Sequence, residues 1–259
     1  DDVRLLLSVT GDDFDKSYRN LTGVNAGATN TSVVKFSTTP SYTFDGSDYI
    51  LMQGVENQNA SVTYPSIWSF NRESTDLIRP VPTKPFTQNS ELTVEFFIKM
   101  PPLAATGSGI DTTIISARDF SISYDSGYGV GGSVSNGDST FASINQNIGL
   151  FNNANGNGSA RIDDDNIAFC KSGNNLKLFV NGVNSGNSTF ENWNGLIGNR
   201  GIQDELYVGK DANQWMGEGL YVTSGLSGVI QELRISDIAR YGADFSVPTE
   251  PYPTGYLNR

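Results

Sequence analysis

Hydrophobic and polar residues alternate with a period of two wherever the sequence shows a regular pattern. Residues 91–100 are the clearest case, with one face reading Leu92, Val94, Phe96, Ile98 and Met100 and the other Thr93, Glu95, Phe97 and Lys99. Successive side chains of a β-strand point to opposite faces. The pattern therefore predicts a half-buried strand whose outer face is partly apolar.

A second alternating run ends at a turn signal. In residues 176–180, leucine and valine alternate with Lys177 and Phe179, and Asn181-Gly182 follows at once. Asn-Gly supplies the two positive φ angles of a type I′ turn. This segment predicts a hairpin.

Further short segments predict strands separated by Gly, Asn, Asp and Ser. A run near the C-terminus has two faces, reading Val229, Leu233 and Ile235 against Ile230, Glu232 and Arg234. Other candidate strands are residues 3–7, 42–45, 49–52, 112–117, 120–124, 166–171 and 206–208. Many short strands predict an all-β fold, a two-sheet antiparallel β-sandwich or jelly roll. Only residues 236–242 favour a helical turn, with Ser236 as N-cap and Gly242 as stop.

The 259 residues predict a single domain, residues 1–259, because no linker divides the strand pattern. Two long excursions interrupt it, at residues 53–85, where three prolines cluster near the end, and at the Gly- and Asn-rich residues 131–160. Such excursions are either packed surface loops or functional loops.

Composition excludes several chemistries. Histidine is absent, so the chain cannot form a Ser-His-Asp triad, a Cys-His dyad or a His-ligated zinc site. Cys170 is the one cysteine, which excludes an internal disulfide. Because Cys170 lies in a predicted strand, we expect a buried, inert thiol.

The charge balance argues against nucleic acid as a partner. The chain has 17 Lys and Arg against 28 Asp and Glu, a net charge of −11. That charge repels phosphates and acidic membrane surfaces. No apolar run is long enough for membrane insertion, and no signal-peptide pattern opens the chain. Since Asp1 stands where a Met would start a chain, we expect a processed protein or a piece of a longer one.

Several segments together resemble laminin-G-like domains of the concanavalin A-like lectin/glucanase group. They are, in order, residues 44–50 (FDGSDYI), 92–99 (LTVEFFIK), 167–182 (IAFCKSGNNLKLFVNG), 206–211 (LYVGKD) and 228–235 (GVIQELRI). The pieces that follow, ARY at 239–241 and FSVPT at 245–249, are similar to the closing segment of marine tailed-phage virion proteins. The resemblance implies a jelly roll over nearly the whole chain, and it identifies a fold and no chemistry.

Calcium is the one cofactor that the resemblance suggests. The family often has an Asp in the closing strand that supports a bound calcium, whereas this chain has Gln231, whose amide is a poorer ligand for a hard cation. Residues 163–165 are three aspartates, of which Asp163 and Asp165 are the candidate metal ligands. The alternative is a solvated turn ahead of the strand at 166–171. No other cofactor is expected.

Two loop-like stretches place a tryptophan among polar groups, as sugar sites often do. The candidate carbohydrate-binding residues are Asn192 and Trp193 in one stretch and Asn213 and Trp215 in the other. The alternative for each tryptophan is a core or loop-lid role. A glucanase would instead need paired carboxylates. The strand signature E-x-D-x-x-E is absent, and Glu91 and Glu95 are interpreted as a solvent-facing strand surface.

These observations favour a non-enzymatic virion surface protein, a phage fibre, knob or capsid decoration that contacts host-surface glycans or decorates the particle. Its expected partners are other virion proteins and a host glycan, and it is expected to be a homo-oligomer or part of a larger assembly on the virion surface or outside the cell. One alternative is a lectin or adhesin module on the surface of a bacterium or alga. Another is a polysaccharide hydrolase or lyase that works through carboxylates.

Overall fold

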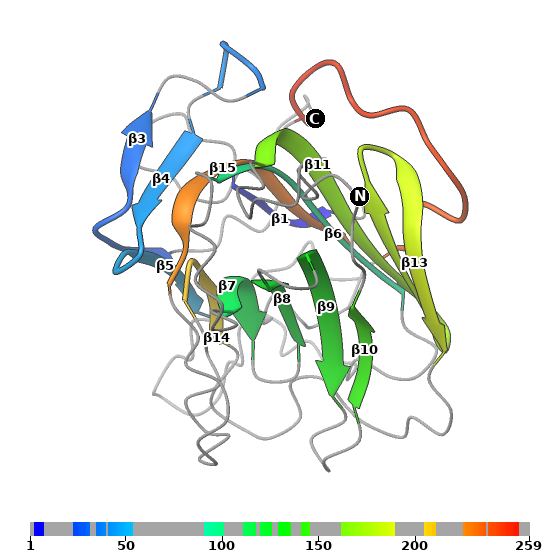
Figure 1. The fold of residues 1–259 in the computed structure, drawn as a ribbon. Coiled ribbons are helices and arrows are strands. Elements are labelled where there is room, and N and C mark those ends of the chain that lie inside the picture. Colours follow the sequence, from blue (N-terminus) through cyan, green and yellow to red (C-terminus); the bar gives the residue numbers. More distant parts are fainter. Residues whose placement is uncertain are drawn as a thin grey trace, which may run out of the picture.

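The computed structural model describes residues 3–7, 23–31, 35–39, 41–53, 91–100, 111–117, 120–125, 129–135, 141–145, 162–189, 205–210, 225–236 and 238–253. Within these ranges, short strands form two antiparallel sheets stacked face to face (Figure 1). No helix among these residues is long and apolar enough to cross a membrane.

The larger sheet has eight strands in the order β13-β12-β11-β6-β15-β4-β3, and β1 also pairs with β15. Its strands are β1 (Val3–Leu7), β3 (Thr29–Thr31), β4 (Ser41–Asp45), β6 (Leu92–Met100), β11 (Ile162–Ser172), β12 (Asn175–Val180), β13 (Val183–Thr189) and β15 (Ser227–Ser236).

The smaller sheet has seven strands in the order β10-β9-β8-β7-β14-β5-β2. They are β2 (Gly23–Ala26), β5 (Tyr49–Gln53), β7 (Asp111–Ala117), β8 (Phe120–Asp125), β9 (Gly129–Ser135), β10 (Phe141–Asn145) and β14 (Glu205–Val208). The predicted all-β, two-sheet antiparallel sandwich is confirmed.

The core lies between the sheets and uses the alternation that the sequence displays. All five apolar residues of one face of β6, from Leu92 to Met100, belong to it, together with residues such as Ile50, Ile115 and Leu206 from the smaller sheet. Removing these side chains from water is the main term that holds the sheets together, at about 25 cal/mol for each Å² of apolar surface.

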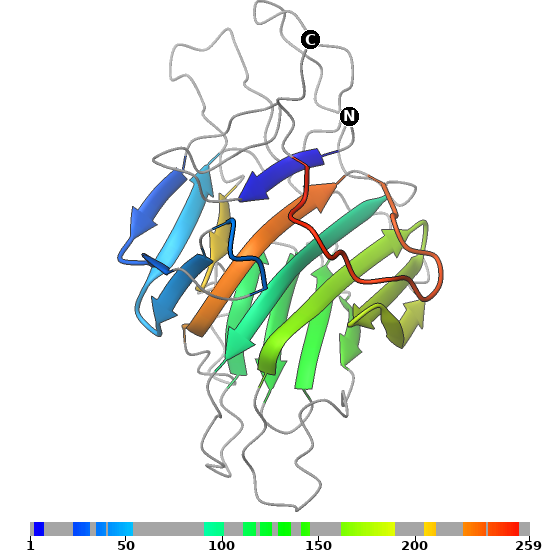
Figure 2. The ribbon, with the colours of Figure 1, turned by 90° about the horizontal axis from the view of Figure 1, so that it is seen from above.

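The outer face of β6 is also buried, which differs from the prediction. Residues 238–253, here called the C-terminal strap, cross the larger sheet in front of β15, β6 and β11 (Figure 2). Phe97 packs with Phe36 and Tyr252, and Glu95 is 0% exposed. The expectation that Glu95 faces solvent is therefore wrong, because a distant segment covers it.

A bulge in β15 reverses the facing that the sequence predicts for this strand. Ile230, Leu233 and Ile235 lie in the core, whereas Val229 packs on the outer side with the cluster around Phe97. The register against β6 shifts between Gln231 and Arg234, and Glu232 has a φ of 56°. One extra residue exchanges the faces of everything beyond it, so the predicted grouping of Val229 with Leu233 and Ile235 is wrong.

The turns follow the sequence in one case and depart from it in another. Asn181 and Gly182 have φ of 49° and 77° and join β12 to β13 as the predicted hairpin turn. Residues 46–48 join β4 to β5, which lie in different sheets, so the segment resembling a family hairpin is a connection between sheets. Asp45 and Asp48 accept backbone hydrogen bonds that shape this connection.

Two other expectations also differ from the structure. Residues 238–242 form no helical turn, because the N–H groups of Ala239 and Arg240 bond to Glu91 and to Thr93 instead of to preceding carbonyls. Part of the expected excursion at 131–160 consists of β9 and β10, which extend the smaller sheet. The excursion expected at 53–85 lies outside the described residues beyond Gln53.

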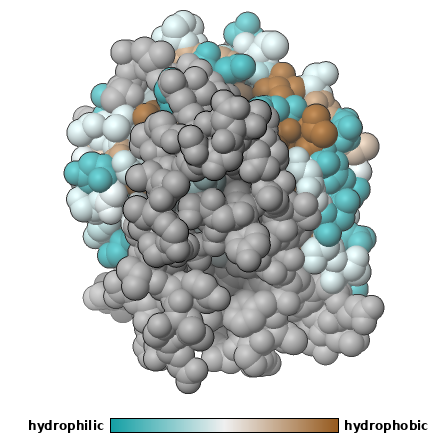
Figure 3. Space-filling model, in the orientation of Figure 1, coloured by the Kyte–Doolittle hydropathy of each residue, from teal (hydrophilic) through white to brown (hydrophobic). Residues whose placement is uncertain are grey.

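The described surface mixes polar and apolar side chains. Hydrophilic and hydrophobic residues are interspersed on the face seen in Figure 3. The exposed large hydrophobic side chains of the described residues are Val24 and Val183, at 52% and 57% exposure.

Candidate functional site

The candidate sugar-binding residues Asn192, Trp193, Asn213 and Trp215 lie outside the described residues. Their role stays a prediction.

The structure describes the surroundings of the candidate calcium ligands in part. Asp163 and Asp165 belong to β11, so the run of aspartates is in a strand and forms no separate turn. Asp165 is 9% exposed, and its carboxylate accepts a hydrogen bond from the amide of Asn181 at 2.5 Å. In the described part of the chain, no three His, Cys, Asp or Glu side chains are placed to hold a metal ion. Calcium binding stays a prediction.

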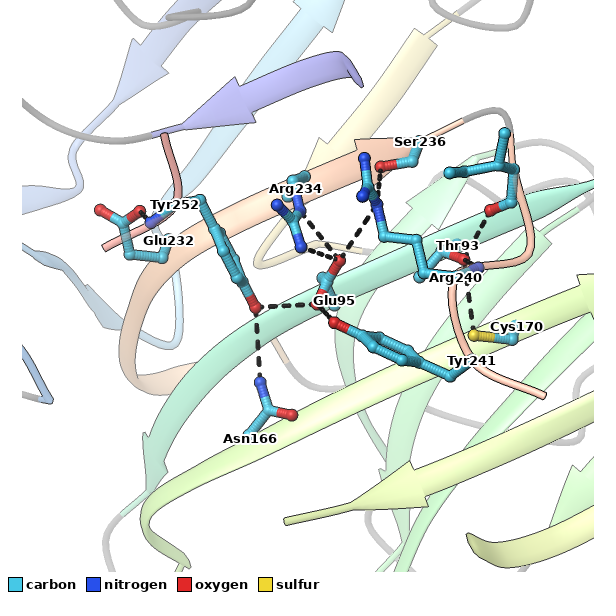
Figure 4. A network of polar contacts seen from close by, with 11 residues as sticks. Thr93, Glu95, Asn166, Cys170, Glu232, Arg234, Ser236, Arg240, Tyr241 and Tyr252 are labelled. Carbon is cyan, nitrogen blue, oxygen red and sulfur yellow. Dashed lines mark hydrogen bonds and ion pairs between the residues drawn. The ribbon is translucent and has the colours of Figure 1, made fainter. Parts of the chain in front are cut away.

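Glu95 is the centre of a buried polar network between β6 and the C-terminal strap (Figure 4). Its Oε1 accepts a hydrogen bond from Arg234 Nε at 2.9 Å and lies 2.7 Å from Arg234 Nη2. Its Oε2 accepts hydrogen bonds from the hydroxyls of Tyr241 at 2.7 Å and Tyr252 at 3.0 Å. Arg240 Nε lies 3.7 Å from Oε1. One carboxylate thus binds residues from β15 and from both ends of the strap.

The electrostatics of this network favour a structural role. Burial raises the pKa of the Tyr241 hydroxyl well above its usual range, and the negative charge of Glu95 adds to the effect. The guanidinium of Arg234 also lies 3.7 Å from the ring centroid of Tyr252, a cation–π contact. A buried carboxylate requires such compensation. Glu95 is therefore a charge that fastens the strap and has no exposed surface for a substrate.

The β15 bulge aligns the residues that receive the strap. Glu232 Oε2 accepts a hydrogen bond from the backbone N–H of Tyr252 at 2.9 Å, and Arg234 pairs in register with Glu95. Bulges frequently redirect side chains in this way. The only sequence signal for this network is Glu232 together with Arg234 within residues 228–235. Periodicity alone does not show that these two side chains face the strap.

A cavity of about 250 Å³ opens beside the network, where the strap passes the edge of the larger sheet. Its lining combines a carboxylate, a thiol, a hydroxyl, an amide, an ammonium group and an aromatic ring, from Glu91, Cys170, Ser172, Asn175, Lys177 and Tyr241. Ala239 and Gly242 of the strap complete it.

Hydrogen bonds hold the walls of the cavity in place. Glu91 accepts from Ser172 Oγ at 3.5 Å and from the N–H of Ala239 at 3.2 Å. Lys177 donates to the carbonyl of Gly242 at 2.5 Å, which ties β12 to the strap. Glu91, Ser172 and Asn175 are exposed. The cavity offers donors and acceptors beside the aromatic ring of Tyr241, and we infer no bond-breaking chemistry from this set.

Cys170 is buried, as the sequence predicts, although it lines the cavity. It is 2% exposed, and burial raises its thiol pKa to about 11. The thiol is therefore protonated at neutral pH and unreactive.

Two stacked antiparallel sheets with a strap across one outer face define a concanavalin A-like jelly roll. A laminin G family model, described as the concanavalin A-like lectin/glucanases superfamily, matches residues 73–244. The match covers more than half of the 259 residues, and the chain belongs to this superfamily. Among curated proteins, none matches the chain.

Several solved structures share the fold. The binding domain of Paraclostridial Mosquitocidal Protein 1 has a TM-score of 0.62 at 12% identity, over 93% of this chain and 50% of that chain. The Botulinum neurotoxin serotype G binding domain has a TM-score of 0.61 at 12% identity, over 93% and 49%. The binding domain of Botulinum Neurotoxin DC, solved in complex with SialylT, has a TM-score of 0.58 at 12% identity, over 92% and 48%.

At such low identity these similarities establish the fold alone, and the chain spans about half the length of the solved chains. The family and fold that the sequence resemblance implies are confirmed. The phage context of that resemblance stays a prediction.

Proposed function

We propose that the chain is a non-enzymatic glycan-binding module and that the cavity beside the strap receives a sugar residue. The observation that carries this proposal is the convergence of the Tyr241 ring with the amide of Asn175, the carboxylate of Glu91 and the ammonium group of Lys177 around one cavity. Sugars present apolar C–H faces to aromatic rings and hydroxyls to such polar groups. A volume of about 250 Å³ suits a single sugar ring better than a drug-sized ligand.

The comparisons support a carbohydrate ligand only in a general way. The superfamily name contains lectins and glucanases, and one structure of similar fold was solved in complex with SialylT. The non-enzymatic part of the proposal is supported by Glu95, which is 0% exposed and bound by Arg234 and two tyrosines. A glycosidase needs two carboxylates that reach the scissile bond.

For the biological setting, we keep the virion surface as the leading proposal. A fibre, knob or capsid decoration would carry many copies, and weak contacts with host glycans would then add up through multivalency. The rival setting is an extracellular adhesin or lectin module of a bacterium or alga. Mass spectrometry of purified particles separates the two, since absence from virions contradicts the first.

The test of glycan binding is an array of host-surface glycans probed with the full chain, with and without calcium. Gly242 allows a sharp variant, because a Cβ at this position meets no atom within 4 Å. Gly242→Phe places a bulky ring at the lining of the cavity, and we expect it to abolish the signal from neutral glycans. Ser37→Phe, at an exposed position of the 35–39 segment, is the matched control and should keep the signal.

A second variant tests the hydrogen-bonding part of the proposal. Asn175→Ala removes an exposed amide from the cavity and should weaken binding about tenfold, which corresponds to one net hydrogen bond of about 1.4 kcal/mol. A blank array in both conditions contradicts the proposal and favours plain decoration. Turnover of laminarin or alginate that is lost on mutating one acidic residue would establish the hydrolase or lyase alternative.

A further inference from the structure

We propose a second ligand site, on the outer face of the smaller sheet, where Tyr49, Tyr207 and Lys210 form a platform for a sugar ring that carries a carboxylate. This inference goes beyond the proposed function, because it uses the opposite sheet and does not depend on the cavity beside the strap.

The three side chains form one compact unit. The ring centroids of Tyr49 and Tyr207 lie 5.8 Å apart with the rings tilted by 53°. Lys210 Nζ lies 4.6 Å from the centroid of Tyr49 and 5.9 Å from that of Tyr207. Both distances fall within cation–π range. An ammonium group is thus held beside two aromatic rings.

The strand pattern shows that the platform faces outward. Ile50 and Met52 of β5 and Leu206 and Val208 of β14 belong to the core. Successive side chains alternate between the faces of a sheet, so Tyr49 and Tyr207 lie on the outer face. Both tyrosines are partly exposed.

An apolar margin continues the platform towards the sheet edge. Tyr207 pairs in register with Leu51, and Leu51 pairs with Val24 of β2. Val24 is 52% exposed, which is unusual among the described large hydrophobic residues. Tyr207, Leu51 and Val24 therefore form an apolar row beside the cationic group.

The backbone that presents Lys210 is firmly anchored. Ser116 Oγ donates to the carbonyl of Lys210 at 2.7 Å, and the N–H of Gly209 donates to the carbonyl of Ile114 at 2.8 Å. Gly209 has a φ of 89°, and a Cβ there would lie 2.7 Å from the Phe44 ring. Only glycine fits this turn, and the turn places Lys210 over the rings before any ligand arrives. Preorganisation of this kind lowers the entropic cost of binding.

The platform unites two sequence motifs that are far apart in the chain. Tyr49 comes from residues 44–50 (FDGSDYI), and Tyr207 and Lys210 come from residues 206–211 (LYVGKD). The pairing of β5 with β14 brings them together. Neither motif indicates a ligand by itself.

The chemistry of the three groups selects the ligand. Aromatic rings accept the C–H face of a sugar, and an ammonium group prefers a carboxylate. Among the described residues Lys210 makes no ion pair with a carboxylate, and its ammonium group contacts the two rings. The net charge of −11 disfavours polyanions. At physiological salt, screening over about 8 Å weakens this long-range repulsion, so a ligand with a single carboxylate is favoured over a polyanion.

The experiment compares three probes against the full chain by calorimetry and by NMR titration: sialyllactose, lactose and acetate. We expect binding of sialyllactose that is at least about tenfold tighter than that of lactose or acetate, since only sialyllactose combines the ring with the charge. Lysine variants then locate the site. Lys210→Gln should weaken sialyllactose binding about tenfold, and Lys210→Arg should keep it.

Two controls separate this site from the cavity and from simple unfolding. Gly242→Phe should leave unchanged the part of sialyllactose binding that Lys210→Gln removes, because Gly242 lines the cavity on the other sheet. Thermal unfolding should show Lys210→Gln to be as stable as the wild type within a few degrees. The proposal is overturned if lactose or acetate binds as tightly as sialyllactose, if no binding is detected at millimolar sialyllactose, or if Lys210→Gln binds like the wild type.

Discussion

Gln231 uses both ends of its side-chain amide on the backbone of Phe36. Its Oε1 accepts from the Phe36 N–H at 3.0 Å, and its Nε2 donates to the Phe36 carbonyl at 2.9 Å. The same amide accepts from the N–H of Lys35 and donates to the carbonyl of Thr39. A carboxylate accepts but cannot donate. Gln231 therefore fixes the segment of residues 35–39 through donated as well as accepted hydrogen bonds, which a carboxylate side chain could not make.

Gln231→Glu should destabilise the fold, although the two side chains have the same shape. The variant loses the donor to Phe36 and Thr39 and buries a negative charge beside their carbonyl oxygens. We expect a loss of about 2–4 kcal/mol in the free energy of unfolding, measured by urea denaturation. Asn187→Asp makes the same chemical change at an exposed amide and should cost less than about 0.5 kcal/mol. Equal losses of stability in the two variants would mean that the hydrogen bonds donated by Gln231 contribute little.

Arg234 should matter for its shape as well as for its charge. Arg234→Met leaves the buried Glu95 without its closest cation and should cost about 3–5 kcal/mol. Arg234→Lys keeps the charge but loses the two-nitrogen contact with Oε1 and the stacking on Tyr252, so we expect an intermediate loss of about 1–2 kcal/mol.

A double-mutant cycle with Glu95→Gln checks the pairing. The double variant Glu95→Gln/Arg234→Met should lose less stability than the sum of the single variants, since neither charge is then left alone. Additive losses would mean that the two residues act independently.

Gly182 and Gly173 form a natural pair of glycines for a test of the strap. Both have positive φ, at 77° and 55°. A Cβ at Gly182 would lie 2.0 Å from the carbonyl oxygen of Phe245, whereas a Cβ at Gly173 meets no atom within 4 Å. Gly173→Ala should cost about 1–2 kcal/mol from backbone strain alone. Gly182→Ala should cost clearly more, because it also pushes the strap away from the turn.

Thermal and urea unfolding of the two variants check this difference. Similar losses would show that Phe245 moves aside easily and that the contact between the turn and the strap contributes little.

Much of the fold follows from local patterns. The alternation in residues 91–100 and 176–180 and the Asn181-Gly182 turn are found in the structure, because each depends on neighbours in sequence. The sequence does not predict the bulge in β15, since its extra residue, Glu232, has no compositional signal. The predicted faces of that strand are wrong for this reason.

The candidate site depends on contacts that periodicity cannot reveal. Glu95 has the polar parity of an exposed strand position, yet Tyr241 and Tyr252 bind it from 146 and 157 residues away. No pattern in residues 91–100 indicates that another segment covers this face of β6. The ARY piece at 239–241 resembles a family motif, but the resemblance does not show that Tyr241 binds Glu95. Periodicity does not reveal the platform of Tyr49, Tyr207 and Lys210 either, because strand pairing brings its residues together from distant segments.

Cys170 provides a reporter for movement of the strap. Its thiol is 2% exposed and packs with Phe179 in a cluster that Tyr241 and Phe245 cover. Because its pKa is about 11, reaction with a thiol reagent such as Ellman's reagent should be slow at about pH 8. Tyr241→Ala removes part of the cover and should raise the labelling rate at least about tenfold. Tyr49→Ala, on the other sheet, should leave the rate unchanged, and equal rates in all three proteins would contradict the covering role of the strap.

Lys171 should give the fold a measurable pH dependence in alkaline solution. It is 1% exposed, and burial lowers its pKa to about 8, with the nearby charge of Glu91 acting in the opposite direction. In the unfolded chain the pKa is near 10.4. Between these values the unfolded state binds more protons than the folded state, so the free energy of unfolding rises with pH.

Lys171→Met removes this dependence. We expect the variant to be more stable than the wild type by about 1–3 kcal/mol at about pH 7, with the gap closing as the pH approaches 10. Above about pH 10 the tyrosines also titrate. Burial raises the pKa of Tyr42 to about 12, for example, so the free energy of unfolding there depends on more than Lys171. Lys35→Met, at an exposed position, is the control for loss of a lysine charge. A gap that stays constant from about pH 7 to 10 would mean that Lys171 keeps an ordinary pKa in the folded chain.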